Sequence, residues 1–232
     1  MLTVTLFILG LLVGSFLNVL IYRLPRGIGF VKGRSVCPHC EKQIAWYDLM
    51  PVISFVLLHG RCRNCHAPIS FQYPLIEIIS GIFFVFAPSI IALILLEIFL
   101  VIAVIDYQHL IIPDSLVIIV GLVGLFQLHL FTALASAGFF GILWLISNGR
   151  WIGFGDVKLA GALGLFFGFP ATLLIIYIAI MVGGAVGLVL MATRRATMKT
   201  ALPFGSLLCV SAGVYLFFGD AIRIWAMHLV RL

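Results

Sequence analysis

Long apolar runs, separated by short polar segments, occupy most of this 232-residue sequence. Hydrophobic residues make up 63% of the chain and charged residues only 9%, whereas charged residues average about 25% in soluble domains. So few charges cannot cover a surface that faces water. The composition therefore predicts an all-α polytopic membrane protein with most of its mass in the bilayer. The run from Met1 to Leu20 lacks a basic n-region, so we expect a membrane span there and no cleavable signal peptide.

About eight transmembrane helices are predicted, because about 20 apolar residues cross the hydrocarbon core. The run from Leu75 to Ile105 is too long for one span, and Pro88-Ser89 divides it into two. The expected spans are residues 2–22, two within 75–105, and 114–131, 133–147, 157–169, 171–192 and 202–218. We therefore expect a first transmembrane helix (1–22), a polar cysteine-bearing segment (23–74), a membrane-embedded core (75–218) and a C-terminal tail (219–232).

Lysine and arginine residues gather in three segments that an eight-span map places on one side of the membrane. They are Arg23, Arg26, Lys32, Arg34, Lys42, Arg61 and Arg63 in the polar segment, Arg150 and Lys158 around a glycine-rich turn, and Arg194, Arg195 and Lys199 before the last span. Because cytoplasmic loops are rich in Lys and Arg, we expect this side to be cytoplasmic. Arg223 and Arg231 in the tail count mildly against this orientation, although an interfacial helix carries basic residues on either side.

Two aspartates lie at the ends of separate apolar runs. Asp106 follows Ala103-Val104-Ile105, and Asp156 follows Gly153-Phe154-Gly155. Carboxylates at membrane depth are energetically unfavourable and usually functional, and two carboxylates that share a proton are the machinery of an aspartic protease. The span map puts both at the cytoplasmic level, where helix packing could join them. The alternative, in which each caps a helix or pairs with an arginine, stays open; it suits Asp114 better than Asp156.

Four cysteines form two CxxC pairs, Cys37/Cys40 and Cys62/Cys65, with 21 residues between the pairs. This spacing is close to that of a zinc ribbon, in which four thiolates hold one tetrahedral Zn²⁺ and leave no open coordination position. A structural zinc would also stabilise a segment of about 50 residues that cannot build much core. Two disulfides are the alternative, which a cytoplasmic position disfavours.

Three further polar residues and one more cysteine stand out in or near the spans. We expect Asn18 to form hydrogen bonds between helices. Glu77 could reach the interface, serve a site or, as we favour, pair with a basic residue of the cysteine segment. Glu97 lies deeper and has no assigned role, and Cys209 is expected to be a buried small hydrophobe.

A series of short motifs runs through nearly the whole chain. They are, in order, Gly14-Ser15-Phe16-Leu17-Asn18, Arg23-Leu24-Pro25, the CxxC pairs, Tyr73-Pro74-Leu75-Ile76-Glu77, Ile105-Asp106, Ile112-Pro113-Asp114, Gly153-Phe154-Gly155-Asp156-Val157-Lys158 and Pro203-Phe204-Gly205. This ordered set resembles the type IV prepilin peptidases, or leader peptidases, of the GxGD class of membrane aspartic proteases. GxGD alone would be a weak signal, but the ordered set is highly specific.

The resemblance implies that Asp106 and Asp156 are the catalytic pair. It implies cleavage of the short basic leader of type IV prepilins, pseudopilins or competence pilins at the cytoplasmic face of the bacterial inner membrane. It thus links the chain to type IV pili, type II secretion and competence. The expected partners are these substrates and membrane lipid, with no nucleic acid, and the oligomeric state is left open.

The resemblance also implies a structural zinc and, in many members, N-methylation of the new N-terminus by S-adenosylmethionine. The stretches before Cys37 and between Asp106 and Asp156 are shorter than in several members. No S-adenosylmethionine motif is readable, so the second activity stays open. The alternatives from other classes are a transporter with an acidic proton relay and a scaffold whose cysteine segment binds a partner. The sequence has no convincing internal repeat, and a zinc ribbon has no obvious place in a transporter. Asp→Asn substitution distinguishes a protease from a scaffold.

Overall fold

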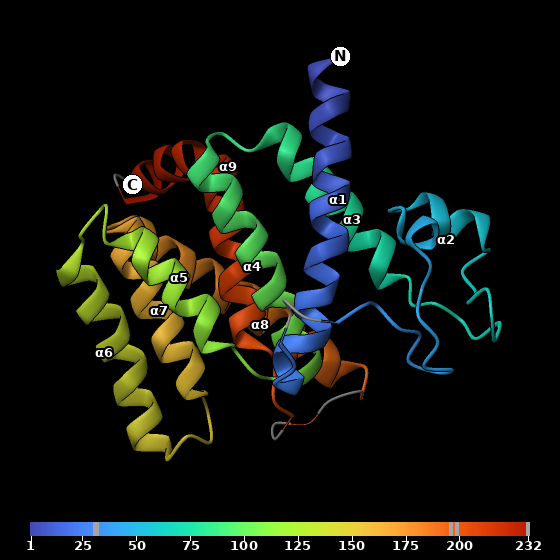
Figure 1. Cartoon of the computed structure of the whole chain (residues 1–232). Helices are drawn as coiled ribbons and strands as arrows, with labels where there is room; N and C mark the ends of the chain where they lie inside the picture. The colour runs from blue at the N-terminus through green and yellow to red at the C-terminus, as the bar shows by residue number, and fades with distance from the viewer. Residues whose placement is uncertain (30–32, 195–196, 198–199, 231–232) are drawn as a thin grey trace. The chain divides into compact units, whose positions relative to one another are not determined.

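The computed structural model describes residues 1–29, 33–194, 197 and 200–230. Within these residues the regular structure is helical, and β-pairing is confined to two isolated bridges (Figure 1). The chain forms two compact units, Met1–Leu93 and Ile94–Leu232. Lys32, Arg195, Lys199 and Arg231, which contribute to the predicted charge bias, lie outside the described residues.

The first unit is built on two helices that pack closely, α1 (Leu2–Arg23) and α3 (Gln72–Phe86). Glycines allow the approach, since a Cβ added at Gly14 would lie 2.6 Å from Glu77 Cα and one added at Gly10 would lie 2.6 Å from Gly81 Cα. A hydrogen bond also joins the two helices, because Asn18 Nδ2 of α1 donates to the Tyr73 carbonyl of α3 at 3.1 Å. The predicted inter-helix role of Asn18 is confirmed.

The polar segment between α1 and α3 holds three short helices, η1 (Leu24–Arg26), η2 (Trp46–Leu49) and α2 (Ile53–Leu57). Glu77 binds the start of α2, because its Oε2 accepts a 2.8 Å hydrogen bond from the Val52 N–H. Glu77 is therefore bonded to a backbone amide, where we expected a basic side chain. This amide lies at a tight turn before α2, where Val52 has a φ of 60°.

The second unit contains the rest of α4 (Ile90–His109) and five more helices. They are α5 (Asp114–Gly124), α6 (Leu130–Ser147), α7 (Phe154–Phe167), α8 (Ala171–Ala192) and α9 (Phe204–Val230). Helix α7 packs against α5 and α6, as Figure 1 shows. A glycine again permits close contact, since a Cβ added at Gly164 would lie 2.5 Å from Ser136 Oγ. Ser136 Oγ also lies 2.9 Å from the Ala160 carbonyl across the same interface.

Among the described residues, five helices are long and apolar enough to cross a membrane, and this supports a multi-pass membrane protein. They span Leu2–Arg26, Ile90–His109, Leu130–Ser147, Ala171–Ala192 and Phe204–Ile224. The other three apolar helices, α3, α5 and α7, have 15, 11 and 14 residues. At a rise of about 1.5 Å per residue they are shorter than a hydrocarbon core of about 30 Å. Eight full spans are therefore not confirmed, although helices occupy all eight predicted places.

Three helix ends differ from the prediction. Helix α4 continues past Asp106 to His109, so this aspartate lies within the last turn. Helix α5 ends at Gly124, well before the expected end at Phe131, because the backbone turns over the next residues and Leu128 has a φ of 54°. Helix α9 continues through the residues that we expected to form a tail, and Gly219 does not interrupt it.

Candidate active site

The two predicted aspartates line one cavity of about 250 Å³ in the second unit. Asp106 comes from the last turn of α4, and Asp156 from the first turn of α7. Both side chains are buried, at 5% and 8% exposure. The other lining residues are Leu110, Ile111, Ile112, Gly153, Phe154, Gly155 and Lys158. Residues 50 positions apart in the sequence therefore present two carboxylates to the same space.

Asp106 is held by the start of α9. The Ser206 N–H donates to Asp106 Oδ2 at 2.7 Å, and the Ser206 hydroxyl lies 3.1 Å from the same oxygen. The hydroxyl also lies 2.7 Å from the Ala103 carbonyl, so its single proton is divided between two acceptors. Donors at a helix N-terminus favour the ionised carboxylate. Oδ2 is thus engaged by α9.

Asp156 is held more loosely. Its Oδ2 accepts one hydrogen bond, from the Gly153 N–H at 3.1 Å, while its own N–H donates to the Gly153 carbonyl. This reciprocal pair caps α7, so the capping role that we treated as an alternative is present together with the cavity position. Oδ1 of Asp156 is buried and has no hydrogen-bond partner among the described residues. A buried carboxylate oxygen without a donor is unfavourable if the group is ionised.

The glycines of two motifs make room for Ile112 at the edge of the cavity. A Cβ added at Gly205 would lie 2.5 Å from Ile112 Cδ1 and 3.1 Å from Asp106 Oδ2. A Cβ added at Gly155 would lie 3.0 Å from Ile112 Cβ. Side chains at either position would displace Ile112 or the Asp106 carboxylate, and this is a physical reason for glycine there.

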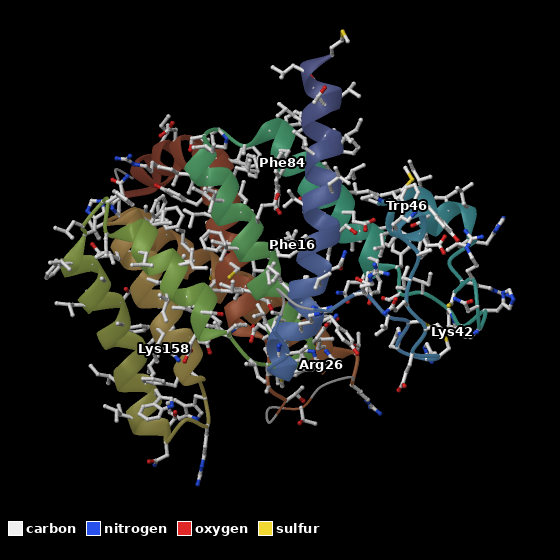
Figure 2. All side chains as sticks on the ribbon, viewed as in Figure 1. Phe16, Arg26, Lys42, Trp46, Phe84 and Lys158 are labelled. Atoms are coloured by element: carbon white, nitrogen blue, oxygen red, sulfur yellow. The ribbon has the colours of Figure 1, made fainter. Side chains whose placement is uncertain are left out.

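Asp114 does not cap α5, contrary to expectation. Its side chain makes no capping hydrogen bond and instead forms an ion pair with Lys158 of α7. The Lys158 ammonium also lies 5.3 Å from the centroid of the Phe154 ring. Asp114 is the first residue of α5 and Pro113 occupies the N-cap position, so the Asp114 side chain is not at the position from which a side chain caps the helix. The pair links α5 to α7 beside the cavity; Figure 2 labels Lys158.

The four cysteines of the first unit form one cluster, with all sulfur atoms within 4.8 Å of one another. Cys37 Sγ and Cys65 Sγ are 3.8 Å apart. A disulfide would require about 2.0 Å, whereas tetrahedral Zn–S bonds of about 2.3 Å place sulfurs about 3.8 Å apart. All four cysteines are free thiols in the structure, so the disulfide alternative is not supported. The cluster could hold a metal such as zinc.

The two CxxC turns have the same backbone pattern. The N–H of Cys37 donates to the Lys42 carbonyl, and the N–H of Cys62 donates to the Ala67 carbonyl. Each turn is also closed by a residue with positive φ, Glu41 at 56° and His66 at 57°. The repeat directs two pairs of thiols toward one point. This arrangement could hold a metal ion, and the described residues there form isolated bridges and no strands.

The thiols of the cluster differ in acidity. The N–H groups of Cys65 and Asn64 lower the pKa of Cys62 to about 7. The N–H of Ala67 lowers the pKa of Cys65, but desolvation and the neighbouring thiols raise it, to about 11 in all. Four adjacent thiolates therefore require a cation to ionise together, and a metal ion supplies that charge.

Ser206 and Ile112 are the site residues that the sequence did not reveal. Ser206 directly follows the Pro203-Phe204-Gly205 motif, which is the signal that could have identified it. Serine is common in membrane helices, and nothing in its spacing from Asp106 predicts the contact across 100 residues. Ile112 belongs to a quoted motif but reads as one apolar residue among many.

Comparisons with known proteins give consistent matches. The bacterial peptidase A24 N-terminal domain matches residues 8–90, and the type IV leader peptidase family matches residues 91–188. A relative from Burkholderia pseudomallei (strain 1026b) is 37% identical over 91% of this chain and 84% of its own. One from Stutzerimonas stutzeri is 33% identical over 97% and 93%. Both are named prepilin leader peptidase/N-methyltransferase. No solved structure matches the chain.

Proposed function

We propose that this chain, which belongs to the type IV leader peptidase family, is an aspartic endopeptidase that removes the leader of prepilins and pseudopilins. The observation that carries the proposal is the cavity that Asp106 and Asp156 line together. Neither a transporter nor a scaffold requires two buried carboxylates that line one cavity, and neither accounts for the match to a peptidase family. The relatives named for this activity cover nearly the whole chain.

The proposed chemistry uses one ionised and one protonated aspartate. The ionised carboxylate takes a proton from water, and the resulting hydroxide forms a bond to the scissile carbonyl carbon. The protonated carboxyl gives its proton to the carbonyl oxygen as the C=O bond opens. When the tetrahedral intermediate collapses, the C–N bond breaks and the amine nitrogen takes the proton that the first carboxylate removed from water. The other carboxylate takes a proton from a hydroxyl of the intermediate as the C=O bond re-forms, so the dyad returns to its starting state. The pair shares one proton throughout, so its apparent titration belongs to both groups.

The hydrogen bonds favour Asp106 as the ionised member. Asp106 Oδ2 has two donors from Ser206, whereas Asp156 has one donor and an oxygen with no partner among the described residues. Donors stabilise the charged form of a carboxyl group, and burial without donors favours the neutral form. We therefore assign the water-activating role to Asp106 and the proton-donating role to Asp156.

Ser206→Ala should lower the cleavage rate up to about ten-fold, because a hydrogen bond to a charged group contributes about 1.5 kcal/mol. The loss should not be complete, because the Ser206 N–H still donates to Asp106 Oδ2 and only the hydroxyl, which also lies near the Ala103 carbonyl, is removed. Initial cleavage rates measure the loss.

The control for Ser206 is Ser211→Ala, which removes another buried hydroxyl from α9 without altering a ligand of Asp106. Its cleavage rate should match that of the unmodified protein. An unchanged rate in the Ser206 variant would contradict a role for the Ser206 hydroxyl in stabilising the charge on Asp106.

The site is placed at the cytoplasmic face of the inner membrane in this proposal. The basic segments predicted to be cytoplasmic support that orientation. A substrate with a short basic leader followed by an apolar helix would then meet the dyad where its leader reaches the membrane. We keep the predicted division into a first helix (1–22), a cysteine segment (23–74), a catalytic core (75–218) and a C-terminal part (219–232).

Two cofactors accompany the proposal. The Cys37/Cys40/Cys62/Cys65 set fits a structural zinc, because four thiolates complete its tetrahedral shell. The relatives' names also include N-methyltransferase, and we extend that activity to this chain, with S-adenosylmethionine as methyl donor to the new N-terminal amine.

One experiment tests both activities. The purified chain is incubated in detergent with a prepilin, with and without S-adenosylmethionine, and the products are weighed by mass spectrometry. Loss of the leader is expected in both samples, and one added methyl group is expected only with the donor. The peptidase assignment would be contradicted if a folded preparation of this chain left the prepilin intact while a related peptidase cleaved the same prepilin.

A further inference from the structure

We propose that the η2–α2 part of the cysteine segment, residues 46–57, inserts its apolar side chains into the lipid interface. The cysteine cluster then lies close to the bilayer surface and does not extend freely into the cytoplasm. The proposal concerns the first unit alone and does not depend on the peptidase activity.

The first observation is the depth of α2 along α1. Gly14 of α1 faces Glu77 of α3, since a Cβ at Gly14 would lie 2.6 Å from Glu77 Cα. Nine residues separate Gly14 from Arg23, which ends α1, so Glu77 lies about 13 Å inside that end at about 1.5 Å per residue. The Glu77 carboxylate binds the Val52 N–H. The start of α2 therefore lies within the length of one glutamate side chain of the α1–α3 contact, well inside the end of α1.

Figure 1 agrees with this depth. Helix α2 lies beside the first turns of α3 and not beyond the lower end of α1, where the chain leaves the helix at η1. A soluble loop between two spans would be expected beyond that end. The position of α2 thus brings it to the level where the outer faces of α1 and α3 meet lipid.

The second observation is the chemistry of the surface at that level. Ile53, Val56 and Leu57 have exposures of 51%, 63% and 70%. Their i, i+3, i+4 spacing puts them on one face of the short helix. Trp46 at the start of η2 is also exposed, at 79%. Single exposed apolar residues are common, but a shared face of large ones marks an interaction surface.

The surface continues onto α3, whose Leu75 and Ile78 are exposed as well. Because α3 is an apolar helix of a membrane protein, these side chains are expected to contact lipid. Exposed apolar side chains on both α3 and α2, which the Glu77–Val52 hydrogen bond ties together, fit a bilayer better than a soluble protein, which could not reach them through the headgroups. We therefore commit to lipid as the occupant.

The opposite end of the segment has the polarity that the headgroup side requires. Lys42, Arg61 and Asn64 on the CxxC turns are all exposed. Figure 2 shows Trp46 beside α2 and Lys42 at the far side of the segment. Tryptophan is favoured at membrane interfaces, and basic side chains are attracted to anionic headgroups. The segment is thus apolar on the side of α2 and basic on the side of the cysteine cluster.

The test measures the contact of one tryptophan with lipid. The full chain, with Trp144, Trp151 and Trp225 replaced by Phe, is placed in nanodiscs whose lipids carry bromine at a shallow or a deep acyl position. The fluorescence of Trp46 should fall by about half with shallow bromine and less with deep bromine, as expected of an interfacial residue. The matched control is Lys42→Trp with Trp46→Phe, which should be quenched by aqueous iodide and not by brominated lipid.

Two results would overturn the proposal. Trp46 could be quenched by iodide as strongly as the tryptophan at position 42, with no effect of brominated lipid. Alternatively, Trp46 could lose iodide access only when a prepilin is added, which would make the face a protein-binding surface. A second variant, Val56→Ser with Leu57→Ser, removes exposed side chains from a fold that does not bury them. It should reduce the lipid quenching of Trp46 about two-fold with the metal content unchanged.

Discussion

Asp106→Asn and Asp156→Asn should each reduce prepilin cleavage by about 10³-fold or more, to background, because a neutral amide cannot complete the acid–base pair. Asparagine has nearly the size of aspartate and keeps an acceptor oxygen. It can therefore still accept the Ser206 N–H at position 106 or the Gly153 N–H at position 156. The helix starts that depend on these bonds should survive, so the loss should be chemical and not structural. Release of the leader, followed by mass spectrometry, measures it.

The matched control for these variants is Asp114→Asn. Asp114 is more exposed and pairs with Lys158 outside the dyad, so an exposed ion pair of about 0–1 kcal/mol is lost and measurable cleavage should remain. All three variants should insert in the membrane and run as monodisperse protein. Near-normal cleavage by either dyad variant would refute the catalytic assignment.

The fold was predictable from the sequence where hydropathy decides it. Apolar runs placed eight helices, and the Pro88-Ser89 break between α3 and α4 appears where expected. Helix ends were less predictable, because a continuous apolar run carries no signal for the turn after Gly124. The same limit applied to span length, since hydropathy alone does not distinguish a full crossing from a short apolar helix such as α7.

The sequence indicated the reactive residues of the candidate site, but not the residues that hold them in place. Buried acids are rare in apolar runs, so Asp106 and Asp156 were conspicuous, and both line the cavity. The CxxC spacing likewise indicated the cysteine cluster. Ser206, by contrast, acts through a contact that depends on how α9 packs against α4. The partner of Asp114 was missed for the same reason, because Lys158 is 44 residues away in the sequence.

Cys62→Ser should abolish stoichiometric metal binding and unfold much of the cysteine segment. The unmodified protein should contain about one zinc per chain, since four thiolates saturate one ion. The described segment has only short helices and isolated bridges, so little else orders it, whereas zinc binding by small thiolate sites contributes about 10 kcal/mol to folding. Metal analysis by mass spectrometry and limited proteolysis between Arg26 and Tyr73 report the two effects. Proteolysis of the cysteine segment by the added protease should become at least about ten-fold faster.

The control is Cys209→Ala, which removes the buried cysteine of α9 in the other unit and should leave the zinc content at one per chain. Cys37, Cys40 and Cys65 should each behave as Cys62 does, because their sulfurs share one 4.8 Å cluster and each supplies one of four bonds. A chelator that strips the metal from the unmodified protein should reproduce the faster proteolysis, which separates loss of the ion from loss of the thiol. The zinc assignment would be contradicted if the unmodified protein contained two disulfides and no metal and its cysteine segment resisted proteolysis equally well. The disulfides, and not an ion, would then stabilise the segment.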